Sequence, residues 1–221
     1  MKALVGTPVL FVLVTLQAVT AWAAPSDAPP AEVVAAAQEG MATFLHAGSG
    51  HLARLGFGSQ ADEDAATLGE GFELLTISPS ALLNEYGPQT VRDIATPLSQ
   101  WQFVVSVRGT PKALLTVAQI DGQWVAVSLG AAVLAKEVSD VLAARPRSAS
   151  YEHRLVRVNQ ATSEFMDVSL LGKSVGEFPL GFLRQTLAVP SGKALPPREH
   201  DFKEVLSVLR PMVKRRLEMD R

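Results

Sequence analysis

The sequence predicts an α+β fold, in which a largely antiparallel sheet is covered by three helices. Residues 101–130 alternate apolar and polar side chains with a period of two, in three runs separated by short turns. Residues 131–144 and 201–219 instead carry apolar residues at helical spacing. Strand candidates follow one another in groups, and helices stand at the ends of these groups, which is typical of α+β domains.

The first 23 residues form an apolar segment behind Lys2, and they end in the small-x-small tripeptide 21–23 (Ala-Trp-Ala). These features indicate a secretory signal peptide, and we expect cleavage after Ala23. The alternative is an uncleaved membrane anchor, because the run reaches the roughly 20 residues that a spanning helix needs. Pro8 and the polar residues of the run favour cleavage.

Residues 24–30 are expected to form a linker, and residues 31–221 a single α+β domain. Its first part, residues 31–98, is interpreted as a helical annex. The annex begins with a helix from residue 31 to about 47, although Gly40 weakens it by about 1 kcal/mol. A polar, acidic loop over 56–71, a strand over 72–77 and a short helix over 81–86 follow.

The sheet core is expected over residues 99–187, with a C-terminal helix over 201–219. Asp121-Gly122 predicts a type I′ hairpin, since both residues tolerate positive φ. Pro211 is expected to kink or split the last helix, whose start is marked by a capping box between Asp201 and Glu204. The predicted core strands are 101–108, 112–119, 123–129, 151–158 and 164–171, with an irregular strand within 173–187.

The composition bounds the compartment and the partner. The 221 residues include no cysteine and no N-x-[ST] sequon, which favours a bacterial envelope protein, secreted or periplasmic, without disulfides. The net charge is −2, so there is no basic surface of the kind that nucleic acid requires. After signal cleavage we expect no stable membrane span.

Two glycine-rich or acidic motifs match known sites only in part. Residues 56–61 match G-x-G-x-x-A, but a helical piece precedes them and three acids follow, which would repel a pyrophosphate. Asp62, Asp64, Glu70 and Glu73 have the offsets of an EF-hand loop. The glycine that such a loop requires is Thr67 here, so a solvated acidic loop is the better interpretation.

No combination of residues predicts catalysis, a cofactor or a metal. The four histidines, His46, His51, His153 and His200, form neither H-x-H nor H-E-x-x-H. Ser49 beside His51 is a weak nucleophile candidate, because residues two apart on a turn rarely form a triad. We therefore predict no catalytic, cofactor-binding or metal residue.

Surface binding is the remaining source of function. Trp101 and Trp124 could stack on a sugar or peptide, but strand tryptophans usually belong to the core. The basic residues of the C-terminal helix could contact an anionic membrane, although its apolar stripe fits the sheet equally well.

The sequence thus favours an exported, non-enzymatic module that binds a protein or peptide partner. One alternative is a hydrolase whose carboxylates, or Ser and His, are assembled across the fold. The other is a protease inhibitor that presents a hairpin tip at 109–112 or 121–122. The oligomeric state is not predicted.

Overall fold

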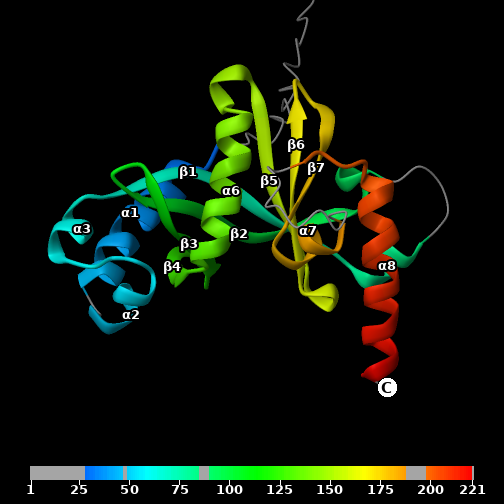
Figure 1. The fold of residues 1–221 in the computed structure, drawn as a ribbon, viewed down its shortest axis with the longest axis horizontal. Helices are drawn as coiled ribbons and strands as arrows, with labels where there is room; N and C mark the ends of the chain where they lie inside the picture. Colours follow the sequence, from blue (N-terminus) through cyan, green and yellow to red (C-terminus); the bar gives the residue numbers. More distant parts are fainter. Residues whose placement is uncertain (1–27, 47–48, 85–89, 188–197, 221) are drawn as a thin grey trace, which may run out of the picture.

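A computed structural model describes residues 28–46, 49–84, 90–187 and 198–220, and within them it contains one seven-stranded sheet (Figure 1). The strand order is β4-β3-β2-β1-β5-β6-β7. Only β1 and β5 pair in parallel, and every other neighbouring pair is antiparallel. The predicted α+β fold with a largely antiparallel sheet is confirmed. The predicted signal peptide lies outside the described residues.

The strands reproduce the predicted alternation and extend beyond it at several ends. Three hairpins close through two-residue turns whose second residue is glycine: Arg108-Gly109, Asp121-Gly122 and Leu171-Gly172, all with positive φ. Such turns match the twist of the strands they join. The strands are β1 (Ala66–Ile77), β2 (Ala95–Val107), β3 (Thr110–Ile120), β4 (Gln123–Gly130), β5 (Tyr151–Val158), β6 (Ser163–Leu170) and β7 (Lys173–Leu180).

The polar loop expected over 56–71 is wrong for most of its length. A short helix, α3 (Gln60–Asp64), occupies its middle, and β1 begins at Ala66 rather than near 72. The glycines that suggested a loop serve close packing instead. A Cβ on Gly71 would lie 2.4 Å from the Phe103 ring, and one on Gly69 would lie 3.0 Å from the Val104 carbonyl oxygen. The expected helical annex therefore also carries the long strand β1.

Three long helices cover the sheet. α6 (Ala132–Ala144) packs on one face, against Leu74, Val104 and Leu155. α1 (Ala31–His46) packs on the other face, chiefly over β4 and β3, and α8 (Phe202–Met219) packs on that same face over β5 and β6. The shorter helices are α2 (Ser49–Arg54), α4 (Pro79–Leu83), α5 (Val91–Ile94) and α7 (Gly181–Leu187).

The C-terminal helix packs as its apolar stripe predicts. Phe202, Leu206 and Leu209 are buried against the sheet. Pro211 was expected to kink or split the helix, and α8 is not split, since it runs from 202 to 219 as one helix. Pro211 lies on its exposed side. Arg210 of α8 donates to the carbonyl oxygens of Leu82 and Asn84.

The face shared by α1 and α8 changes from apolar to charged between β2 and β1. The sheet register places Trp101 opposite Glu73, Glu73 opposite Arg154, Arg154 opposite Asp167, and Asp167 opposite Glu177. Directly opposed residues point to the same face, so these side chains form one row across five strands. We name Glu73, Arg154, Asp167 and Glu177 the charged row.

Candidate functional site

The two edges of the sheet differ in how they are protected. β7 carries Lys173 and Pro179, and an isolated antiparallel bridge between Glu177 and His200 covers part of its outer edge. Charges, prolines and covering segments are the usual devices that keep an edge strand from pairing with another chain. This edge is therefore protected in part.

The opposite edge, β4, lacks such devices. Among the described residues its sole strand partner is β3. Its sequence, QWVAVSLG, contains neither a charged residue nor a proline. A bulge at Val127 is its one irregularity, and residues 123–126 pair with β3 in regular register. No described strand pairs with the outer backbone groups of this stretch.

A groove runs along β4 on the side of α1. Its volume is about 350 Å³, and it lies between the α1 residues Glu39, Gly40 and Phe44 and the strand residues Trp124 and Ala126. The helix comes very close to the strand here, because residue 40 has no side chain. A Cβ on Gly40 would lie 2.0 Å from the Ala126 Cβ. The glycine that seemed to weaken the helix therefore sets the shape of this groove.

The indole of Trp124 fixes one end of the groove. Its Nε1 donates a hydrogen bond of 3.0 Å to Oε1 of Glu32, in the first turn of α1. Trp124 is partly buried and belongs to the apolar cluster beneath α1, as Trp101 does at 6% exposure. Both tryptophans therefore pack in or against the core.

Apolar side chains are exposed along the same edge. Val125 and Val127 are each 42% exposed, and Ile120 at the end of β3 is 48% exposed. Val125 lies opposite Ala118 in the register. We name Ile120, Val125 and Val127 the edge patch. An incoming strand beside β4 would bring side chains against the groove on one face and the edge patch on the other.

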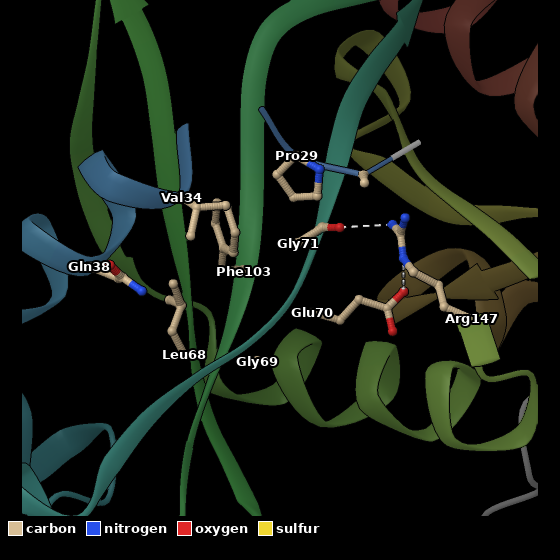
Figure 2. Close-up of a pocket in the computed structure, with 10 residues that line it drawn as sticks. Pro29, Val34, Gln38, Leu68, Gly69, Glu70, Gly71, Phe103 and Arg147 are labelled. Carbon is tan, nitrogen blue, oxygen red and sulfur yellow. Dashed lines mark hydrogen bonds and ion pairs between the residues drawn. The ribbon is translucent and has the colours of Figure 1, made fainter. Parts of the chain in front are cut away.

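A second pocket, of about 300 Å³, lies at the start of α1 beside the irregular part of β1 (Figure 2). Figure 2 shows the Arg147 guanidinium between the Gly71 carbonyl oxygen and the Glu70 carboxylate. Its Nε donates to Glu70 Oε1 at 2.5 Å, and one terminal nitrogen donates to the Gly71 oxygen at 2.9 Å. The opposite wall is apolar and includes Val34, Leu68 and Phe103.

His153 contacts the same carboxylate from beneath. Its Nδ1 lies 2.9 Å from Glu70 Oε1, and its side chain is fully buried. Burial alone would raise the pKa of Glu70, but the hydrogen bonds from His153 and Arg147 outweigh it and hold the pKa below its ordinary value. An ionised carboxylate shared by two donors is a structural clamp that joins β1, β5 and the segment after α6.

A third pocket, of about 320 Å³, lies between β7 and the segment that leads into α8. Glu177, His200 and Asp201 line it, with Thr90 and Ser174 at its rim. Asp201 caps α8, since its Oδ1 accepts the Lys203 N–H at 2.8 Å. His200 Nδ1 lies 2.9 Å from Glu204 Oε2. Burial, with the charges of Asp167, Asp201 and Glu199, raises the pKa of Glu177 to about 8.

The acidic residues singled out by the EF-hand offsets are not brought together. Asp62 accepts from Arg108 at 2.7 Å and from the Gly58 N–H, while Asp64 accepts from Gln60. Glu70 faces α6, whereas Glu73 faces the opposite side in the charged row. Among the described residues no three His, Asp or Glu side chains are placed to hold a metal ion. The G-x-G-x-x-A segment leads into α3, five residues long, without a strand before it.

The histidines are separated in the fold as well. His46 lies near the end of α1, with Nδ1 2.6 Å from the Ala42 carbonyl oxygen. His153 is in the sheet and His200 is beside α8. Ser49 and His51 fall in α2, but their side chains lie outside what the structure describes.

The sequence did not predict the Glu70 clamp or the pocket at Glu177. Glu70 meets His153 only because β1 pairs with β5. Glu177 meets Asp201 only because the segment before α8 runs beside β7. The bare edge was visible in principle, because QWVAVSLG is a strand without charge or proline. The position of β4 at the end of the sheet was not visible in the sequence.

No family model, curated protein or solved structure matches the chain. In the described ranges, no helix has the length and apolar character needed to cross a bilayer.

Proposed function

We propose that the protein is an exported, non-enzymatic binding module, in the bacterial envelope or outside the cell, that captures an extended segment of a partner protein at β4. The observation that carries this proposal is the unprotected edge of β4, in a sheet whose other edge is covered. The backbone groups of residues 123–126 would pair with the incoming strand and supply affinity. The flanking surfaces would supply specificity.

The partner segment follows from the two faces of the edge. Side chains of an added strand alternate between faces, so every second one would point toward the groove beside Gly40 and Phe44. The others would lie against the edge patch. Because β4 carries no charge, we expect an uncharged segment rich in β-branched and aromatic residues.

A single strand fits this site better than a second copy of the chain. The groove of about 350 Å³ is concave and lies on one side of the edge, so separate side chains can enter it. Pairing of β4 with β4 of another copy would bury the edge patch. It would not place a separate strand beside the groove, with side chains free to enter it. Such pairing is the outcome that a measurement of oligomeric state would reveal.

A hydrolase is the second candidate, and a specific observation supports it. Glu177 and Asp201 line one pocket, and a carboxyl group that stays protonated at neutral pH can act as a general acid. Turnover of chromogenic glycosides or esters, lost in Glu177→Gln, would establish it. The inhibitor alternative rests on the hairpin tips at 108–109 and 121–122, and incubation with a panel of proteases tests it.

Peptide selection tests the main proposal. Random ten-residue peptides displayed on phage would be selected on the purified protein, and the enriched peptides measured in solution by fluorescence polarisation. We expect alternating, uncharged sequences whose affinity falls at least about tenfold in Val125→Lys with Val127→Lys. Met219→Lys, at a residue 64% exposed at the end of α8, is the matched control and should bind normally. The proposal would be contradicted if the selected peptides bound the double lysine variant with unchanged affinity, or if the protein formed a dimer through β4.

A further inference from the structure

The strongest remaining feature is a buried carboxylate that has no counterion. Glu177 is 3% exposed, and it lines the pocket of about 320 Å³ between β7 and the segment before α8. No described side chain donates a hydrogen bond to its carboxylate, which accepts only from the backbone N–H of Glu177 itself. The backbone of Glu177 pairs with that of His200. A buried carboxylate is normally paired, because an unpaired one loses its hydration without compensation.

The charged groups around Glu177 do not compensate it. Asp167 from β6, and Glu199 and Asp201 from the segment before α8, all add negative charge. Three basic side chains in this region contact other carboxylates. Arg154 on β5 contacts Asp167 and Glu152, Arg145 contacts Glu199, and His200 contacts Glu204 of α8.

The backbone holds this arrangement in place. The chain before α8 pairs with β7 through two hydrogen bonds between Glu177 and His200, of 3.1 and 2.9 Å. It lies so close that a Cβ on Gly176 would stand 2.4 Å from the Glu199 Cγ. Gly176 has φ of +156°, a conformation that favours glycine. The acidic groups are therefore fixed by the strand and by the helix cap, and the pocket persists between them.

We propose that this pocket is a reversible binding site for an organic cation, an ammonium or guanidinium group that pairs with the Glu177 carboxylate. Hydroxyl groups of Thr90 and Ser174 at the rim could accept further hydrogen bonds from such a group. The same chemistry is offered by a lysine or arginine side chain of a partner and by a free small amine. The site lies on the edge of the sheet opposite to β4, so this inference stands apart from strand addition.

Proton release distinguishes this site from general attraction to an acidic surface. Glu177 binds a proton up to a pH of about 8, and an entering cation must displace it. Below pH 8 the affinity should therefore rise about tenfold for each pH unit, and at pH 7 close to one proton should be released per cation bound. Screening by exposed carboxylates would give neither effect in this range.

Isothermal titration calorimetry of the full purified protein, in two buffers of different ionisation enthalpy, tests the proposal. The probes are N-acetylarginine amide, N-acetyllysine amide and cadaverine, with N-acetylnorleucine amide as the neutral control. Preference for the two amides would indicate a partner side chain, and preference for cadaverine a free amine. We expect cation binding with proton release in the native protein, and at least tenfold weaker binding in Glu177→Gln.

Asp140→Asn, at an exposed carboxylate on α6, should bind as the native protein does. Ser174→Trp, which fills the pocket from its rim, should abolish binding while Glu177 itself is retained, and it serves if Glu177→Gln does not fold. The proposal is overturned if none of the cations binds. It is also overturned if the neutral probe binds equally well, or if Glu177→Gln binds with unchanged affinity.

Discussion

Gly40 of α1 lies so close to Ala126 of β4 that a Cβ on residue 40 would stand 2.0 Å from the Ala126 Cβ. The helix and the edge strand are therefore in near backbone contact at this point. The depth of the groove beside β4 depends on that contact. A larger residue at position 40 must push α1 away from the strand.

We predict that Gly40→Ala destabilises the protein by about 1–2 kcal/mol. Alanine gains about 1 kcal/mol in helix propensity, and the clash with Ala126 costs more than this gain. Urea unfolding followed by circular dichroism measures the change. Adding Ala126→Gly should restore most of the stability, because it removes the opposing Cβ. If Gly40→Ala alone were as stable as the native protein, the contact between α1 and β4 would be looser than described.

Glu70 should be required for stability at neutral pH. Its carboxylate accepts from Arg147 and His153, and Glu70→Gln removes the negative charge that both contact. We expect a loss of about 2 kcal/mol at pH 7. Because the pKa of Glu70 is depressed in the folded state, this stabilisation is present above its unfolded pKa of about 4.5 and is lost as the pH falls through the lower folded value.

Thermal unfolding of the Glu70→Gln variant between pH 3 and pH 7 measures that dependence. The difference from the native protein should shrink below pH 4. Glu218→Gln, at an exposed residue of α8, is the control and should change little at any pH. A constant difference across the range would show that the Glu70 charge has no part in the clamp.

Glu177 should have the opposite effect on stability. Its folded pKa of about 8 lies above the unfolded value of about 4.5, so the folded state binds the extra proton between these values. The contribution of Glu177 to the stability of the protein is then greatest at low pH, and it falls as the pH rises through about 8. Glu177→Gln should match the native protein near pH 4 and exceed it by about 2 kcal/mol at pH 9, less than the full shift because water reaches the pocket.

Denaturant midpoints at pH 4, 7 and 9 measure this effect, with Asp140→Asn as the matched control. An advantage of Glu177→Gln that is equal at all three values would mean that the gain comes from packing. A loss of stability at pH 9 would mean that the carboxylate has a counterion.

Leu171 stands at an unfavourable position for its type. It has φ of 49° in the turn between β6 and β7, and it is 78% exposed. Bulky residues adopt this conformation at a cost, whereas asparagine tolerates it. Leu171→Asn should therefore stabilise the protein by roughly 0.5–1 kcal/mol, measured by thermal unfolding. Asp121→Asn, in the hairpin between β3 and β4 at the other end of the sheet, is the control and should be neutral within error, since aspartate already suits its turn.

The sequence predicted the sheet where strand chemistry and turn chemistry agree. Asp121-Gly122 and the alternation around it located β3 and β4 to within two residues, and β5 matched its predicted bounds of 151–158. β1 was predicted too short, because Gly69 and Gly71 indicate a loop when read locally. Only contact with Phe103, 32 residues later, explains Gly71.

The candidate sites were less accessible to sequence reasoning than the strands. The parallel pairing of β1 with β5 brings Glu70 to His153, 83 residues away in the chain. The pocket at Glu177 forms because the segment around His200 lies beside β7. Neither event leaves a local pattern. The place of β4 at the end of the sheet likewise depends on the order of all seven strands in the described part of the chain.

Strand addition at β4 is tested most directly by hydrogen exchange on the backbone amides of β4, measured by NMR with and without a selected peptide. Strand addition predicts that amides within residues 123–126 exchange at least about tenfold more slowly in the complex. Amides of β7 should be unchanged, because that edge is already covered. Unchanged exchange along β4, with protection at another element, would show that the partner binds elsewhere and would contradict strand addition at β4.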